Sequence, residues 1–306
     1  MIVGHERQVA YLQKVIKKST WAHGYLFCGP EHVGKTATAF QFARSLICDK
    51  SLAEWGGCQK CVQCGLEDLR LSDRFFELVP RSREEAEKND TTREISIKEI
   101  SALRRWLMFR SAKSRVIIVQ RAEVMSKDAA NALLKILEEP NPGTVFIFIT
   151  STPQYILPTV RSRTVPLRFD FVPDRELRKI KGATDELIQL AAGRPGVLIS
   201  SVNDIEFYAN EKDLLGMALK VWNGGVSEAT MVSKKLAEAE AQWNAIFLHL
   251  ARLIKREMIF AKTDSIPRLV LSVTSGLKVI SNFETTNVNR RLALDVIFFN
   301  LQRARS

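Results

Sequence analysis

The chain has 306 residues, a net charge of +11 and an isoelectric point near 9.5, and 46% of its residues are apolar. This composition is typical of a globular protein of two or three domains with a large core, and it excludes a membrane-spanning chain because no apolar run reaches the length of a span. The polar N-terminus has no signal-peptide core, so we expect a cytoplasmic protein, and its positive charge suits either a nucleic-acid partner or a generally basic proteome.

The first predicted elements surround a glycine-containing loop. Residues 5–19 place apolar side chains on one helical face, residues 25–28 form a short apolar run typical of a buried strand, and residues 37–46 predict a helix without breakers. Between that strand and helix, residues 29–36 read GPEHVGKT and fill every fixed position of the pattern G-x-x-x-x-G-K-[ST]. The pattern and its strand–helix context predict a phosphate-binding P-loop rather than a chance glycine turn.

The P-loop chemistry is a phosphate cradle. Glycines let the backbone N–H groups approach the phosphates, Lys35 is expected to reach the outer phosphates, and Thr36 is expected to bind magnesium. The loop therefore predicts ATP or ADP with Mg²⁺ as ligand. The residues expected to bind it are Gly29, His32, Val33, Gly34, Lys35, Thr36 and Ala37.

Four of the five cysteines are closely spaced, at Cys48, Cys58, Cys61 and Cys64. In a cytosolic protein, two adjacent C-x-x-C steps favour a metal over disulfides, and four thiolates leave no open position for catalysis. We therefore predict a structural zinc site, the alternative being free thiols on a flexible insertion. Cys28, in the apolar strand, is expected to be an inert core residue.

The rest of the first half alternates between strands and helices. Strands are predicted at 74–79, 116–119, 144–150 and 165–169, helices at 97–108 and 126–138, and a polar loop at 81–94. This alternation up to about residue 170 favours a doubly wound α/β domain with a parallel sheet. From Pro173 onward the apolar spacing is almost entirely helical.

A hydrolytic P-loop protein needs acidic groups at the end of a second strand. The residues after strand 116–119 are Gln120 and Arg121, an amide and a cation, and the first acid, Glu123, lies further along. The sequence therefore predicts a chain that holds a nucleotide but cleaves it poorly. A basic cluster between Arg104 and Arg115 includes Trp106 and Phe109, which we interpret as helix core contacts rather than base-stacking platforms.

Several segments in order carry a family resemblance: Gly4-His5-Glu6, residues 23–27 (HGYLF), the P-loop, the four cysteines, residues 131–140 (NALLKILEEP), residues 152–154 (TPQ) and residues 162–164 (SRT). Over about residues 4–170 the chain resembles the bacterial DNA polymerase III clamp-loader subunits, gamma/tau and delta-prime, of the AAA+ class. The resemblance implies an AAA+ P-loop domain at 1–170 with a zinc-knuckle insertion at 48–64, a helical lid at 171–203 and a helical collar at 204–306.

The family implies an ATP-driven hetero-pentamer with gamma/tau and delta subunits that opens a sliding clamp and sets it on primed DNA. Members that hydrolyse ATP carry an Asp-Glu pair where this chain has Gln120 and Arg121, and a lid arginine that aligns with Gly196. Both differences favour the delta-prime type, which holds nucleotide and lends an arginine finger to a neighbour. The matching position is Arg163, although Thr164 replaces the cysteine of the family's Ser-Arg-Cys motif.

Two alternatives stay open at this point. One is an active gamma/tau-type ATPase in which Glu123 replaces the lost acid, and the other is a zinc-dependent nucleic-acid-binding protein with a vestigial P-loop. The resemblance also makes Thr150 or Ser151, at the end of strand 144–150, a candidate sensor of the outer phosphate.

Overall fold

The computed structural model describes residues 2–50, 54–80, 94–109, 114–237, 243–260 and 290–305. The predicted polar loop at 81–94 lies almost entirely outside these residues, as do Arg110 and Lys113 of the basic cluster. The chain divides into two compact units, Met1–Ile180 with Gly193–Gly196 and Lys181–Ala192 with Val197–Ser306. The boundaries expected at residues 170 and 203 stay a prediction.

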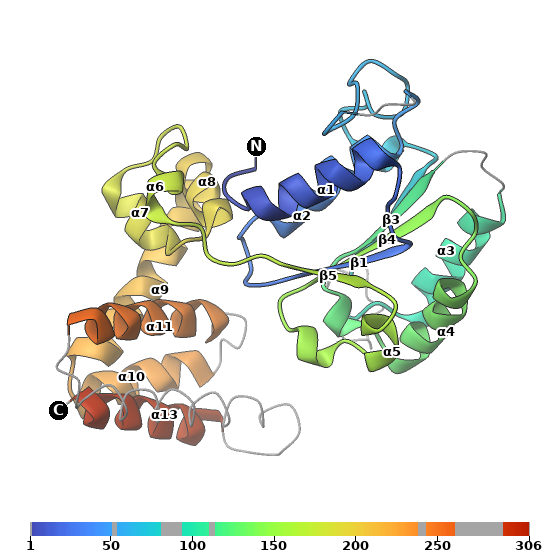
Figure 1. Cartoon of the computed structure of the whole chain (residues 1–306). Coiled ribbons are helices and arrows are strands. Elements are labelled where there is room, and N and C mark those ends of the chain that lie inside the picture. Colours follow the sequence, from blue (N-terminus) through green and yellow to red (C-terminus); the bar gives the residue numbers. More distant parts are fainter. Residues whose placement is uncertain are drawn as a thin grey trace. The chain divides into compact units, whose positions relative to one another are not determined.

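The first unit is built on a parallel five-stranded sheet (Figure 1). The strands are β1 (Gly24–Cys28), β2 (Phe75–Leu78), β3 (Arg115–Val119), β4 (Thr144–Thr150) and β5 (Val165–Arg168), in the spatial order β2-β3-β4-β1-β5. Every residue of β1, β3 and β4 is buried. Burial on both faces explains why these strands read as continuous apolar runs rather than alternating ones.

Helices cover both faces of the sheet. The apolar sides of α1 (Glu6–Lys18) and α2 (Lys35–Leu46) pack in one core with one set of strand side chains. Those of α3 (Ile97–Met108), α4 (Lys127–Glu138) and α5 (Pro158–Arg161) pack in a second core against the opposite face. Ser96 and Glu99 begin α3 with a capping box, and the Ser126 hydroxyl accepts from the Ala129 N–H at the start of α4. The strands and helices predicted in this half are confirmed.

The remaining short elements of the first unit are η1 (Leu69–Leu71), η2 (Ala122–Val124), η3 (Pro153–Tyr155) and α6 (Asp174–Leu177). The described part of the second unit is helical throughout, as predicted. Its helices are α7 (Asp185–Ala191), most of α8 (Pro195–Asn203), α9 (Ile205–Asn223), α10 (Val226–Ala237), α11 (Trp243–Phe260) and α13 (Arg290–Arg305). Side chains of α9, α10, α11 and α13 share one apolar core. Among the described residues, no helix is long and apolar enough to cross a membrane.

The basic cluster is partly structural. The Arg115 guanidinium is buried, lies 5.1 Å from the Trp106 ring centroid and donates to the Trp106 carbonyl at 3.0 Å. Burial lowers the pKa of Arg115. Trp106 contacts the second core as expected, but the same expectation is wrong for Phe109, which is 75% exposed just after α3 ends.

Candidate nucleotide site and cysteine cluster

The P-loop connects β1 to α2 through glycines whose backbone other residues rarely adopt. Gly29 has a φ of 147°, and a Cβ there would lie 1.9 Å from the Phe169 carbonyl oxygen. Gly34 has a φ of 108° and precedes the first residue of α2. A glycine is therefore required where the chain leaves the strand, and the loop presents the N-terminus of α2, with its unpaired N–H groups, to the cavity beside it.

A cavity of about 480 Å³ lies against this loop. Five of the seven predicted nucleotide-binding residues line it: His32, Gly34, Lys35, Thr36 and Ala37. The other two do not, because Gly29 lies against Phe169 and the Val33 side chain is fully buried in the core. The facing wall comes from the end of β4 and from the residues after β3 and β4, and Gly196 completes the lining. This volume is in the range of small-molecule sites.

Lys35 is 6% exposed, and its ammonium donates to the carbonyls of Gly29 and Pro30. Burial lowers the pKa of Lys35 to about 8, while the charges of Glu31 and Glu123 act in the opposite direction. A phosphate group beside this ammonium would restore the charged form, because an opposite charge at close range favours ionisation. The lysine is therefore poised for an anion.

His5 ties the N-terminal segment to the P-loop. Its Nε2 lies 2.8 Å from the Val33 carbonyl oxygen, and burial lowers the pKa of the imidazole. A neutral ring with its proton on Nε2 donates this hydrogen bond at neutral pH. The bond fixes residues 2–5 beside the loop.

Gln120 occupies the place where a hydrolytic site needs an acid. The Thr36 hydroxyl donates to Gln120 Oε1 at 3.3 Å, and Gln120 Nε2 donates to Glu77 Oε1 at 3.0 Å. Gln120 is therefore beside the expected magnesium ligand, as the sequence indicated. A neutral amide is a weak magnesium ligand and cannot take a proton from water.

Glu123 reaches the cavity, which its later sequence position did not indicate. Arg121 has a φ of 47° and directly precedes the short helix η2, which carries Glu123 to the cavity wall. One Glu123 oxygen accepts from the Ser151 hydroxyl at 3.1 Å, and the other is buried without a hydrogen-bond partner. Thr150 and Ser151, the candidate phosphate sensors, line the same wall.

Gly196, which the family resemblance aligns with a lid arginine, lines the cavity beside the P-loop. Its N–H donates to the His32 carbonyl oxygen at 2.8 Å, and a Cβ there would lie 2.8 Å from that oxygen. The position is thus close enough for a side chain to contact a nucleotide, but glycine supplies no charge there.

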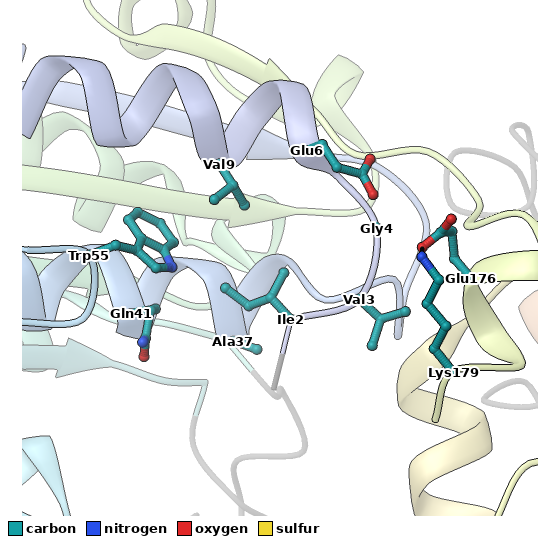
Figure 2. A pocket seen from close by; sticks show the side chains of 10 residues that line it. All are labelled: Ile2, Val3, Gly4, Glu6, Val9, Ala37, Gln41, Trp55, Glu176 and Lys179. Carbon is teal, nitrogen blue, oxygen red and sulfur yellow. Dashed lines mark hydrogen bonds and ion pairs between the residues drawn. The ribbon is translucent and has the colours of Figure 1, made fainter. Parts of the chain in front are cut away.

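A second cavity, also of about 480 Å³, adjoins the first turn of α2 (Figure 2). Ala37 lines both cavities. The walls of this second cavity are formed by the N-terminal segment and α1, by Gln41 of α2, by Trp55 of the cysteine loop, and by the ion pair of Glu176 and Lys179. Apolar side chains predominate on the walls beside α1 and α2, as expected where a ring system binds.

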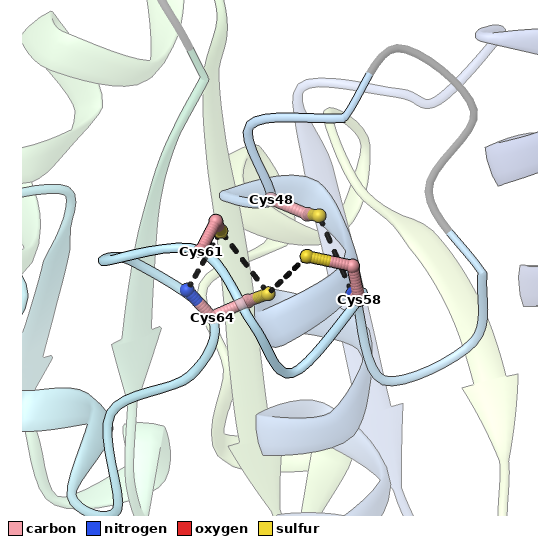
Figure 3. Close-up of side chains that lie close together, drawn as sticks. All are labelled: Cys48, Cys58, Cys61 and Cys64. Atoms are coloured by element: carbon pink, nitrogen blue, oxygen red, sulfur yellow. Dashed lines mark hydrogen bonds between the residues drawn. The ribbon is translucent and has the colours of Figure 1, made fainter.

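The four clustered cysteines converge (Figure 3). All four Sγ atoms lie within 4.8 Å of one another, with Cys58 and Cys64 at 3.6 Å and Cys61 and Cys64 at 3.3 Å. Ligands of a tetrahedral zinc with 2.3 Å bonds lie about 3.8 Å apart, so the donor set fits zinc. The N–H of Gln59 also donates to the Cys64 sulfur at 3.2 Å, as backbone groups do around zinc thiolates.

The thiol chemistry agrees with a cation at this position. Hydrogen bonds lower the pKa of the Cys58 thiol, and the one from the Lys60 N–H contributes most. Burial and the neighbouring sulfurs raise the pKa of Cys64. The fourth thiolate is stable only if a cation offsets the other charges. Cys28 lies apart and buried, its Sγ 3.6 Å from the Leu167 carbonyl oxygen, and burial raises its pKa.

Arg163 does not line the cavity beside the P-loop. It follows α5, is exposed, and its guanidinium donates to Glu138 Oε1 and to the Thr159 carbonyl oxygen, both at 3.1 Å. Thr164, the departure from the family motif, is buried, and its hydroxyl donates to the Val160 carbonyl oxygen. The substitution therefore changes an inward side chain and leaves Arg163 on the surface.

Known proteins are similar to this chain in sequence and in fold. The family model described as "DNA polymerase III, delta subunit" matches residues 4–173, more than half of the chain. The gamma/tau subunit of Mycobacterium tuberculosis is 35% identical over 58% of this chain and 30% of its own length. The delta-prime subunit of Pseudomonas aeruginosa is 35% identical over 47% of this chain and 42% of its own, and that of Bacillus subtilis is 32% identical over 53% and 46%.

The aligned region thus spans less than half of each of these relatives. A RuvB variant from Thermotoga maritima superposes with a TM-score of 0.51 over 82% of this chain and 88% of its own, at 13% identity, which supports the α/β AAA+ fold alone. On the family match and the relatives together, the chain belongs to the DNA polymerase III clamp-loader subunit family of the gamma/tau and delta-prime type.

Proposed function

We propose that this chain is a delta-prime-like clamp-loader subunit that holds a nucleotide without cleaving it and lends Arg163 to a neighbouring ATPase subunit. The observation that carries the proposal is the contact between Thr36 and Gln120, which puts a neutral amide beside the expected magnesium ligand. Arg121, a cation, follows on the same wall of the cavity. The chain therefore combines a complete P-loop with an amide and a cation at the positions where a hydrolytic site needs acids.

The two adjoining cavities suit the two ends of a nucleotide. The phosphates would lie between α2 and the facing wall, bound by Lys35, Thr36 and the loop N–H groups, with Mg²⁺ on Thr36. The base would extend past Ala37 into the second cavity, between the N-terminal segment and the cysteine loop. Zinc on the four cysteines would be structural, because four thiolates complete a tetrahedral shell.

The partners follow from the family and not from the chain alone. The proposed assembly is a hetero-pentamer with gamma/tau and delta subunits, held by the helices of the second unit. Within it the chain would act on a sliding clamp and primed DNA in the cytoplasm. An exposed Arg163 outside its own cavity fits a role at a neighbour's nucleotide, because a guanidinium stabilises charge on a transferring phosphoryl group.

One observation favours a second candidate, an active gamma/tau-type ATPase. Glu123 lines the same cavity as Lys35 and Thr36, and its Oε2 has no hydrogen-bond partner. A carboxylate placed there has one oxygen that is not engaged and that could polarise a water molecule. The two candidates differ in whether bound ATP is cleaved.

The test is to purify the chain and measure nucleotide affinity and copurification with gamma/tau and delta subunits in the same preparation. The proposal predicts binding of ATP and ADP and a stable assembly with the other subunits. A chain that binds neither nucleotide nor any of these subunits would overturn it.

A further inference from the structure

The cysteine loop contributes a wall of the second cavity. Trp55 lies three residues before Cys58 and is the only aromatic residue among the described residues that line this cavity. Figure 2 shows its indole beside Gln41 of α2 and opposite Val9 of α1. An indole face in a cavity next to a phosphate site is suited to stack on a nucleobase.

Residues next to Trp55 are fixed to the P-loop helix. The Gly56 N–H donates to the Ser45 hydroxyl at 2.8 Å, and a Cβ at Gly56 would lie 2.3 Å from Gln41 Nε2. Gly56 and Gly57 have φ values of 86° and 75°, so the turn that follows Trp55 requires glycine. Trp55 itself packs against the core formed by α1, α2 and the sheet.

The metal-ligand part of the loop is held by the same helix. The Arg44 guanidinium donates to the carbonyls of Cys64 at 2.7 Å and of Glu67 at 3.1 Å, and also to that of Leu66. Gly57 packs between α2 and the cysteine cluster, since a Cβ there would be 2.8 Å from the Arg44 carbonyl oxygen and 2.8 Å from the Cys64 Cβ. The loop is therefore anchored at two points, α2 and the cysteine cluster, with Trp55 next to both.

We propose that Trp55 is a specificity residue that stacks on the nucleobase, and that metal on the four cysteines holds it in place. The inference rests on the proposed nucleotide binding and adds a role for the metal site. Metal occupancy and nucleotide affinity are then thermodynamically linked, because a base binds best to a preformed wall. Loss of the stack should weaken base-dependent affinity roughly tenfold.

The experiment compares ADP with inorganic tripolyphosphate, which carries phosphates but no base, by calorimetry on the full chain. Trp55→Ala should bind ADP roughly tenfold more weakly and tripolyphosphate as wild type does. Trp55→Phe, which retains an aromatic face, should recover most of the ADP affinity. Zinc content and circular dichroism of each variant should match the wild type.

The metal arm repeats these titrations after chelation, with metal analysis to confirm removal. Chelation should weaken ADP binding to the wild type to the level of Trp55→Ala, and should cause little further loss in Trp55→Ala itself. Ser45→Ala provides a variant with all four thiols intact, and it should weaken ADP binding severalfold at unchanged zinc content.

The outcomes separate this inference from the proposed function. If the wild type binds neither ADP nor tripolyphosphate, the proposed nucleotide binding itself fails. If both bind and Trp55→Ala is indistinguishable from wild type, Trp55 is not a base contact and only the inference fails. Equal losses on chelation in wild type and Trp55→Ala, for both ligands, would show that the metal supports the fold as a whole and would overturn the linkage.

Discussion

The two walls of the cavity beside the P-loop differ in the groups that they present. The wall formed by the loop after β1 and the start of α2 has both glycines, Lys35 and Thr36 in place. The facing wall, formed by the end of β4 and the residues after β3 and β4, presents Gln120 and Arg121, an amide and a cation. Under the proposed function, holding a nucleotide depends on the loop after β1, whereas cleaving it would require acids on the wall after β3.

The physical reason lies in what each wall is made of. The P-loop wall depends mostly on backbone conformation, and Gly29 could not be replaced without displacing Phe169 from β5's end. On the facing wall, Gln120 and Arg121 lie outside both apolar cores of the first unit. The Gln120 side chain accepts from the Thr36 hydroxyl and donates to Glu77 there.

The largest expected effect concerns the group that this chain would supply to a neighbour. Arg163→Ala should reduce hydrolysis at one adjacent site of a reconstituted complex by roughly 10³-fold, because an arginine finger offsets charge in the transition state. Nucleotide binding and zinc content of this chain should not change, since Arg163 lies outside both sites and its exposed pair with Glu138 contributes little stability. Single-turnover ATPase and clamp loading are the measurements.

Arg161→Ala is the matched control, an exposed arginine two residues earlier at the end of α5. It should leave ATPase and clamp loading unchanged. If both variants are silent, the chain contributes no finger, and if only Arg161→Ala is defective, the finger is assigned to the wrong residue.

The next effect tests the intact wall. Lys35→Ala should weaken ATP and ADP binding roughly 100-fold, because it removes a buried charged donor to the phosphates. Lys17→Ala, an exposed lysine in the last turn of α1, is the control and should bind as wild type. Affinity that survives Lys35→Ala would mean that nucleotide binds elsewhere.

A smaller effect tests the altered wall. Gln120→Asp should make binding more dependent on magnesium, so that the ratio of affinities with and without Mg²⁺ rises about tenfold, because a carboxylate beside Thr36 attracts the cation. In the control Gln120→Asn, the new side chain has the shape of aspartate without its charge, and the ratio of affinities with and without Mg²⁺ should equal that of the wild type. Equal ratios in all three proteins would show that residue 120 does not face the metal.

The smallest effect is a pH dependence from Lys35, whose pKa of about 8 in the free chain should rise when phosphates bind. In the free chain, the Lys35 amine is mostly protonated below pH 8 and mostly neutral above it. Above pH 8 the binding of phosphates therefore requires uptake of a proton, and the affinity falls as the pH rises. Affinity for ADP should fall about threefold between pH 7.5 and 8.5. Calorimetry at both values decides, and an affinity that rises with pH contradicts the assignment.

Local patterns predicted the P-loop wall well. The strand, the glycine turn and the helix are consecutive in sequence, so their residues are near one another whatever the rest of the chain does. The four cysteines were predicted for the same reason, since three of them lie within seven residues. Helix α3 was predicted at residues 97–108 for the same reason, because the helical spacing of Ile100, Leu103 and Leu107 lies within the segment itself.

Positions that depend on distant contacts were not predictable. Glu123 reaches the cavity because Arg121 adopts a left-handed conformation before η2, which an arginine does not signal. Trp55 is a cavity wall because Gly56 is fixed on Ser45, and nothing in the local pattern indicates that partner. Phe109 was expected in the core from its place beside a helix, but α3 ends one residue earlier and leaves it exposed.

The measurement that tests the central claim most directly is the rate of ATP cleavage at this chain's own site in an assembled complex whose other sites are inactivated. The P-loop lysines of all partner subunits are replaced by alanine, so that any remaining cleavage occurs at Lys35 of this chain. The account predicts bound ATP that stays intact, with turnover at least about 10³-fold below the 1 s⁻¹ at the low end of enzymes. Turnover near 1 s⁻¹ that is abolished by Lys35→Ala and by Glu123→Gln would contradict it and establish an active ATPase.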